Sequence, residues 1–349
     1  MTQTNNQKLT IIQPDDFHLH LRDGEVLQST VQQAAKQFSR AIIMPNLKPP
    51  VTTTEQAQQY RDRILKYLPE GSHFTPLMTL YLTDNTPPEE IRKAKASSIV
   101  YGVKLYPAGA TTNSDAGVTS LSKCTATLEE MQKQGIPLLM HGEVTTDGID
   151  IFDREAVFID TVLIPLRKDF PDLKVVFEHI TTKTAAEYVT DAEGFIGATV
   201  TPQHLMFNRN HLLVGGIHPH VYCLPILKRE ENRWALLKAV TQNNRRFFAG
   251  TDSAPHARGA KENACGCAGC YSASHAIELY ATIFEQQGAL DQLEWFTAIN
   301  GPKFYNLAVN KKMVTLERKT WQIPESMPFG KDQVVPLMAG ENLGWKLVG

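Results

Sequence analysis

The chain has 349 residues, of which 42% are hydrophobic and 21% charged, a composition typical of globular proteins rather than disordered or fibrous ones. Its formal net charge is −2 and its Lys and Arg residues are scattered, so no dedicated nucleic-acid surface is expected. No apolar run long enough to span a membrane occurs, and the N-terminus MTQTNNQKLT lacks the basic and apolar regions of a signal peptide. We therefore expect a cytoplasmic protein that does not enter a membrane.

Short apolar runs alternate with amphipathic stretches along the chain, as expected for parallel strands connected by helices. The predicted strands are residues 8–21, 41–46, 74–82, 99–107, 136–143, 174–181, 195–201 and 246–254. The predicted helices include residues 26–38, 54–68, 120–135 and 229–240. Strand–helix units in this number predict a (β/α)8 TIM barrel. An open doubly wound sheet is the alternative, but no G-x-G-x-x-G follows the first strand.

The pattern predicts one barrel domain over residues 1–349. The first strand begins near residue 8, which leaves no room for a separate N-terminal domain, and the barrel is expected to cover about 8–310. Residues 311–349 are irregular in pattern and rich in Pro and Gly, as in WQIPESMPFGKDQVVPLMAGENLGW. We expect them to form a short C-terminal extension packed on the barrel.

The segment DDFHLHLRDG, residues 15–24, carries two histidines two residues apart. Because alternate side chains of a strand share a face, His18 and His20 should point the same way, with Arg22 next in line. The residues expected on the opposite face, under covering helices, are Phe17, Leu19 and Leu21. Imidazole is a common metal ligand, so this pair indicates a metal site, with two structural histidines as the alternative.

Polar and ionisable residues also lie at the C-terminal ends of several other predicted strands. They are Asn46, Lys104, His141, His179 and Asp252. In a barrel the C-terminal ends of the strands converge on one face, where catalytic sites are built. A single histidine in such a place is often structural, but their coincidence on separate strands favours a shared metal site.

Lys104 lies in IVYGVKLYP between apolar residues, and a lysine is seldom buried without a partner. A salt bridge at the strand end is one interpretation. The other is reaction of the neutral amine with carbon dioxide, which gives a carbamate able to bridge two metals. The remaining five ligands exceed the four of a tetrahedral zinc. A bridging carboxylate would divide the set between two ions about 3.5–4 Å apart, which together can activate a water molecule.

A family resemblance becomes visible once these segments are read together. HLHLR, MPN, GVKLYPAGATTNS, LLMHGE, FEHITT, TPQHL, YCLPILK and GTDSAPHARGAKENACGCAGC resemble the short bacterial-type (class II) dihydroorotases of the amidohydrolase superfamily. The resemblance covers roughly residues 10–275. It implies a dihydroorotase that interconverts (S)-dihydroorotate and N-carbamoyl-L-aspartate, the third step of pyrimidine (UMP) synthesis. It also implies two zinc ions per subunit and a homodimer.

The same resemblance implies a role for each candidate site residue. His18, His20 and Asp252 would bind the more buried zinc, and His141 and His179 the second. Lys104, as N6-carboxylysine, would bridge the two ions, and Asp252 would also move a proton to the ring nitrogen. The implied substrate contacts are Arg22, Asn46 and His256 at the carboxylate, the backbone of Leu224 and Ala268 at the ring, His141, and Thr111 and Thr112 on a mobile loop, residues 107–118.

Other polar groups have competing interpretations. The second H-x-H, His218 and His220, contains a proline and follows no apolar strand, so it predicts a loop without metal. His204 is expected to be structural or to support a ligand, and Asp16 to orient the imidazoles. The remaining candidates are Cys223, Cys265, Cys267 and Cys270, for which free thiols are favoured over a structural zinc because the spacing is not that of zinc knuckles.

Two rival functions follow from these patterns. One is another cyclic amidase of the dihydropyrimidinase or hydantoinase type, which would lack the carboxylate set of Arg22, Asn46 and His256. The other is an inactive barrel that serves as a structural partner, against which the intact set of ligand residues argues.

Overall fold

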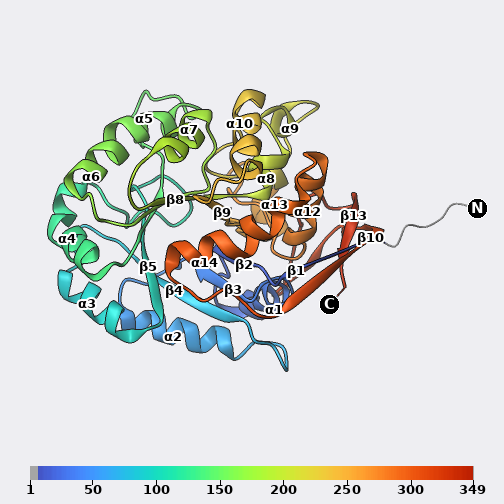
Figure 1. The fold of residues 1–349 in the computed structure, drawn as a ribbon, viewed down its shortest axis with the longest axis horizontal. Coiled ribbons are helices and arrows are strands. Elements are labelled where there is room, and N and C mark those ends of the chain that lie inside the picture. Colours follow the sequence, from blue (N-terminus) through green and yellow to red (C-terminus); the bar gives the residue numbers. More distant parts are fainter. Residues whose placement is uncertain (1–6, 349) are drawn as a thin grey trace, which may run out of the picture.

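The computed structural model describes residues 7–348, which are dominated by an eight-stranded parallel sheet surrounded by helices (Figure 1). The strands of this sheet are β2 (Asp15–Leu19), β3 (Arg40–Ile43), β4 (Thr75–Tyr81), β5 (Val100–Leu105), β6 (Leu138–His141), β7 (Val175–Glu178), β8 (Ile196–Val200) and β9 (Phe247–Ala249). Each strand pairs in parallel with the next along the chain. The predicted (β/α)8 barrel is confirmed.

Helices follow the strands and cover the outside of the sheet (Figure 1). They are α1 (Leu27–Gln37), α2 (Thr54–Leu65), α3 (Pro88–Ser97), α4 (Thr125–Gln134), α5 (Arg154–Phe158), α6 (Ile164–Asp169), α7 (Lys183–Asp191), α8 (Pro202–Met206), α9 (Asn210–Leu213), α10 (Glu230–Thr241), α11 (Arg258–Lys261), α12 (Ala276–Gln286), α13 (Leu290–Glu294) and α14 (Asn300–Tyr305). Local sequence explains their limits: a capping box of Thr53 and Gln56 starts α2, and Gly135 at φ 66° ends α4. No helix within residues 7–348 has the length and apolar character needed to cross a membrane.

The prediction of a single strand over residues 8–21 is wrong. Lys8–Ile12 form β1, which pairs antiparallel with β10 (Met313–Gln322), and only β2 belongs to the barrel. Pro14 lies between them and has no N–H to donate to a continuous ladder. The break lets the N-terminal strand leave the barrel and join the C-terminal residues.

The described C-terminal residues, whose sequence pattern is irregular, form four strands. β10 pairs with β1 on one side and with β13 (Asn342–Leu347) on the other, and β11 (Met327–Phe329) and β12 (Asp332–Val334) form a hairpin. Figure 1 shows β10 and β13 beside β1 at one side of the barrel. Trp345 of β13 is fully buried and belongs to the same apolar core as the outer face of the barrel, so this sheet packs on the barrel.

The barrel interior is filled by apolar side chains from its strands. The buried members are Phe17, Ile42, Met44, Leu77, Leu139, Val176 and Phe248. The placement of Phe17 under the helices is therefore wrong, whereas Leu19 and Leu21 lie in the outer core as predicted. The register of β2 with β3 shifts between Asp16 and Leu19, which breaks strict alternation. Phe17 consequently stacks on Tyr305 with ring centroids 5.1 Å apart.

The two ends of the sheet meet where β2 approaches the segment after β9. The backbone N–H of Asp252 donates to His18 O at 2.9 Å, and that of His20 donates to Ser253 O at 3.1 Å. Gly250 permits this approach, because a Cβ there would lie 3.1 Å from Cβ of His18 and 2.6 Å from Cβ of Thr199. This seam brings residues from the first and last barrel strands side by side.

Candidate active site

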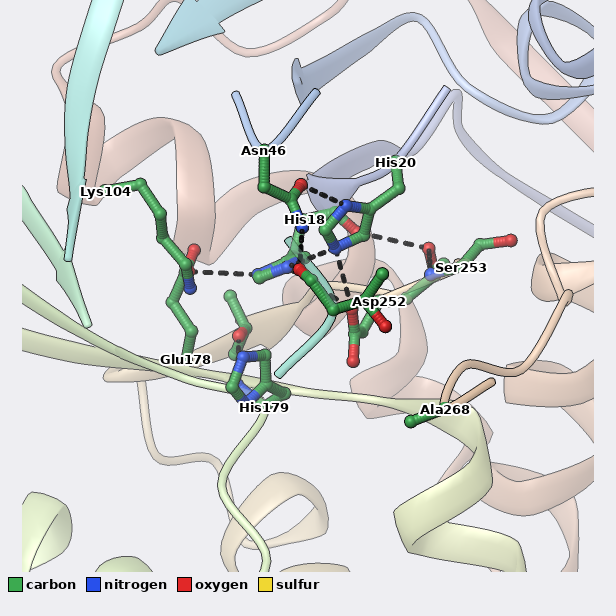
Figure 2. A network of polar contacts seen from close by, with 12 residues as sticks. His18, His20, Asn46, Lys104, Glu178, His179, Asp252, Ser253 and Ala268 are labelled. Atoms are coloured by element: carbon green, nitrogen blue, oxygen red, sulfur yellow. Dashed lines mark hydrogen bonds and ion pairs between the residues drawn. The ribbon is translucent and has the colours of Figure 1, made fainter. Parts of the chain in front are cut away.

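His18, His20 and Asp252 converge at the seam of the barrel (Figure 2). Nε2 of His18 lies 3.2 Å from Nε2 of His20, and the two nitrogens lie 3.3 and 3.1 Å from Oδ1 of Asp252. All three side chains are buried. Two imidazole nitrogens and one carboxylate oxygen thus face a single point, and the predicted association of these three residues is observed.

The site contains an unusual concentration of left-handed backbone. Arg22, His179 and Asp252 have φ values of 61°, 41° and 46°. Such conformations cost energy in residues other than glycine and persist where the surroundings enforce them. His179 is held by its N–H, which donates to Oγ1 of Thr199 at 2.6 Å. The backbone therefore turns sharply at Arg22, His179 and Asp252, and these turns direct the side chains toward the site.

His179 lies between His18, a member of the group with His20 and Asp252, and His141. Its ring centroid lies 4.9 Å from that of His18 and 4.8 Å from that of His141. Nδ1 of His179 is buried and has no hydrogen-bond partner among residues 7–348. A buried polar atom without a protein partner is uncommon, and a bound ion or water would satisfy it. Nε2 of His141 instead lies 2.8 Å from Oε2 of Glu143.

Lys104 is fully buried and contacts the carboxylate of Glu178 (Figure 2). The same Oε2 of Glu178 lies 3.0 Å from Nδ1 of His18. The salt-bridge interpretation of Lys104 thus describes the unmodified side chain. Burial lowers the pKa of Lys104, which favours the neutral amine.

Two carboxylates in this region were missed by sequence reasoning. Glu178 belongs to a potential metal-binding group with His18 and His179, and Glu143 contacts His141. Each is close in the chain to a predicted ligand, in FEH and in HGE. Strand alternation would have pointed Glu178 away from His179, but the positive φ of His179 breaks that alternation and returns both side chains to the same region.

Burial controls the charge of the histidines. It lowers the pKa of His18 and holds the pKa values of His20 and His179 well below their usual range. These imidazoles are therefore neutral at physiological pH and have a free nitrogen lone pair, the form that binds metals.

The predicted carboxylate-binding residues lie next to this group. Nη2 of Arg22 lies 3.1 Å from Nε2 of His256, and Nε of Arg22 donates to Pro255 O at 3.0 Å. Nε2 of His256 also lies 3.0 Å from Ala268 O. Asn46 Oδ1 lies 2.8 Å from Nδ1 of His20, so this amide orients the imidazole of a candidate ligand.

The loop of residues 107–118 reaches the same place. Nδ2 of Asn46 donates to Thr112 O at 3.1 Å, and Nδ2 of Asn113 donates to Asn46 O at 2.9 Å. Within the loop, Ser114 Oγ donates to Thr111 O at 2.6 Å. In this conformation the loop is therefore docked on Asn46, with both predicted threonines at the edge of the site.

The other polar candidates serve structural contacts. His204 uses both ring nitrogens, Nδ1 at 2.7 Å from Thr201 Oγ1 and Nε2 at 2.9 Å from Pro225 O, in agreement with a structural role. His218 precedes a short 3₁₀ helix, Pro219–Val221, and His220 lies within it, where the sequence predicted a loop. The expectation that Asp16 orients imidazoles is wrong, because its carboxylate accepts from the backbone N–H of His18 at 3.0 Å and from Thr251.

The four candidate cysteines, Cys223 and the three of the 265–270 loop, have different environments. Cys223 and Cys270 are buried, Cys265 is exposed, and each is a free thiol. The potential metal-binding groups found among residues 7–348 are formed by histidines and carboxylates, at the barrel seam.

Comparison with known proteins places the chain in a family. No family model matches the sequence. A dihydroorotase of Ralstonia pickettii is 66% identical over 340 residues, covering 97% of this chain and 99% of its own. The crystal structure of the Campylobacter jejuni dihydroorotase superposes with a TM-score of 0.91 at 38% identity, covering 100% of this chain and 99% of that one.

Two further structures bear on the alternatives. A dihydroorotase of Saccharomyces cerevisiae, solved in complex with 5-fluoroorotic acid, has a TM-score of 0.91 at 32% identity, covering 98% of each chain. The L-hydantoinase of Arthrobacter aurescens, with a TM-score of 0.82 at 16% identity over 98% of this chain and 83% of its own, shares the fold alone. Because close relatives match along nearly their whole length, the chain belongs to the dihydroorotase family, enzymes that hydrolyse a cyclic amide.

Proposed function

We propose that this enzyme catalyses the reversible, zinc-dependent interconversion of (S)-dihydroorotate and N-carbamoyl-L-aspartate, the third step of pyrimidine synthesis. The observation that carries the proposal is the convergence of His18, His20 and Asp252 at the C-terminal end of the barrel, beside Arg22. A cyclic amide needs an activated water, and a carboxylate substrate needs a fixed cation. Both requirements have candidate residues at this one place.

The donor set fits zinc, which prefers nitrogen and carboxylate ligands. His18, His20 and Asp252 would hold one ion, and His141 and His179 would contribute to a second. The unpartnered buried Nδ1 of His179 and the neutral imidazoles support this assignment. When bound, two zinc ions activate water at neutral pH and polarise the substrate carbonyl.

Lys104 would complete the site as a carboxylated lysine. Its neutral amine attacks the carbon of carbon dioxide and loses a proton, which gives a carbamate with one negative charge. The carbamate would then stand beside the anionic Glu178, an arrangement that is unfavourable in a buried place without cations. We therefore infer that carboxylation of Lys104 and metal loading depend on each other.

The substrate carboxylate would be bound by Arg22, Asn46 and His256. Burial lowers the pKa of His256 to about 3, so its imidazole is neutral and has a single N–H, which the substrate carboxylate would have to share with Ala268 O, 3.0 Å from Nε2. Arg22 supplies the positive charge that the carboxylate requires. The backbones of Leu224 and Ala268 and the hydroxyls of Thr111 and Thr112 would contact the ring and the closed substrate, with His141 nearby.

Asp252 is the residue proposed to move the proton. During ring opening, water adds to the amide carbonyl, the C–N bond breaks, and the departing nitrogen takes up a proton. The Asp252 carboxylate would take the proton that the attacking water loses and pass it to that nitrogen. Its contacts with His18 and His20 would keep the carboxylate beside the proposed zinc site.

The chain is proposed to act as one domain, because β1 and β10 join residues near both ends of the described chain in a single sheet against the barrel. The family resemblance further predicts a homodimer in the cytoplasm, and a mass measurement in solution tests the dimer.

A parallel assay of two substrates tests the proposed function. The purified, zinc-supplemented protein should open dihydroorotate and should leave dihydrouracil, which lacks the carboxylate, essentially unchanged. Turnover of dihydrouracil at a comparable rate would identify a dihydropyrimidinase-type enzyme instead. Absence of turnover with both substrates in the zinc-loaded protein would support the inactive homologue.

A further inference from the structure

Lys261, the last residue of α11, directs its ammonium group at three backbone carbonyls. Nζ donates to Gly269 O at 2.6 Å, to Cys267 O at 2.7 Å and to Tyr222 O at 3.2 Å. The residue is only 4% exposed. All three hydrogens of the ammonium are therefore used on carbonyl oxygens rather than on a carboxylate.

This arrangement is costly for the fold. A buried cation loses its hydration, and carbonyl dipoles replace it only in part. Burial accordingly lowers the pKa of Lys261. A methionine would fill a similar volume without that cost, so packing alone does not explain the charge. Its specific effect is to hold together three carbonyl oxygens that otherwise repel one another.

The three carbonyls belong to the two loops that carry the proposed ring contacts. Cys267 and Gly269 flank Ala268, and Tyr222 lies two residues before Leu224. A second link joins the same loops, because the N–H of Gly269 donates to Tyr222 O at 2.9 Å. The ammonium thus fixes both backbone segments at one point.

The position of the 265–270 loop also affects the carboxylate contacts. Ala268 O lies 3.0 Å from Nε2 of His256, which lies 3.1 Å from Nη2 of Arg22. Gly269 has φ 146°, and a Cβ at this position would lie 2.5 Å from Ala254 O. The loop is therefore pressed against the segment after β9, and a displacement of Ala268 would disturb His256.

We propose that Lys261 is a positioning residue for substrate binding. Its ammonium fixes the 265–270 loop to the 222–224 segment and so holds the backbones of Leu224 and Ala268 at the correct separation for a dihydropyrimidine ring. The inference rests on the proposed function. It assigns the Cys-rich loop a role that depends on its carbonyl groups and its glycine.

Steady-state kinetics of Lys261→Met test the proposal. We expect the KM for dihydroorotate to rise about tenfold or more, with kcat changed by about threefold at most and zinc content unchanged, because binding is impaired rather than chemistry. Lys93→Met, on the exposed surface of α3, is the control. Its KM should stay within about twofold of the parent value.

Lys261→Arg provides a second variant that keeps the buried charge. A planar guanidinium cannot direct donors at the three carbonyls as an ammonium does, so its KM should also rise. A parent-like KM in a folded Lys261 variant, or a loss confined to kcat and zinc content, would overturn the proposal. If the parent enzyme fails to turn over dihydroorotate, the proposed function is contradicted instead.

Hydrogen–deuterium exchange tests the same inference without substrate. Peptides covering residues 262–271 and 222–224 should exchange faster in the Lys261 variants than in the parent. The Lys93→Met control should leave them unchanged. Equal exchange in these peptides in the parent and in both Lys261 variants would contradict the role of the ammonium in holding the loops.

Discussion

Nε2 of His20 and Oδ1 of Asp252 lie 3.1 Å apart although 232 residues separate them in the chain. The contact exists because the first and last barrel strands meet at the seam, where Asp252 N–H donates to His18 O at 2.9 Å. The contacts that close the barrel therefore also bring the residues of the candidate metal site together.

Asp16 fastens this seam and is the first residue to test. Its buried carboxylate accepts from the backbone N–H of Thr251 at 2.8 Å and from Thr251 Oγ1 at 2.5 Å. Asp16→Ala should lower the free energy of unfolding by roughly 2–5 kcal/mol, because each buried donor left unpaired costs about 1–3 kcal/mol. Urea denaturation measures this. Asp62→Ala, on the exposed face of α2, is the control. An equally small change in the free energy of unfolding of both variants would show that Asp16 does not stabilise the seam.

Lys104→Ala should lose both bound zinc and activity, because the bridging carbamate cannot form. Short carboxylic acids added to this variant should restore part of both, since they can occupy the place of the missing carbamate. Elemental analysis and the dihydroorotate assay follow the two quantities together. A fully active parent enzyme whose Lys104 is unmodified in a high-resolution electron-density map would show that the carboxylysine assignment is wrong.

Asp252→Asn should abolish turnover in both directions while the protein remains folded. The amide cannot accept the proton that the carboxylate moves, and loss of a general acid–base group typically reduces a rate by about 10²–10⁴-fold. Circular dichroism establishes that the fold is retained, and both ring opening and ring closure are assayed. Substantial activity in either direction would mean that another residue moves the proton.

Thr111→Ala and Thr112→Ala test the loop of residues 107–118. A hydrogen bond to a charged group contributes about 1.5–3 kcal/mol, so each variant should lose about tenfold to a hundredfold in kcat/KM. Zinc content should not change. Thr125→Ala is the control, because its exposed hydroxyl donates to Ser122 O at the start of α4. Parent-like kcat/KM in both loop variants would show that this loop only connects two elements and does not contact the substrate.

The sequence predicted the barrel because each strand carries its own apolar run and each is followed by a helical pattern. It also predicted the convergence of His18, His20 and Asp252, because strand ends in a barrel share one face. These inferences depend on local periodicity and on the symmetry of the fold, and both can be recognised in a single sequence.

The errors arose where backbone geometry departs from regular alternation. The register shift in β2 placed Phe17 in the barrel interior, and the positive φ of His179 brought Glu178 into the site. The contacts of Lys261 were likewise invisible, because they join backbone carbonyls of two loops that carry no common motif. Pairing of β1 with β10 depends on a contact between distant residues, which periodicity cannot specify.

Titration of the metal-free enzyme with zinc, followed by dihydroorotate ring opening, tests the central claim most directly. Ring-opening activity should be absent without metal and should rise to a plateau at about two zinc ions per chain, as a two-metal site requires. Full activity at a single zinc ion, activity that does not depend on zinc, or no ring opening at any zinc concentration would contradict the account.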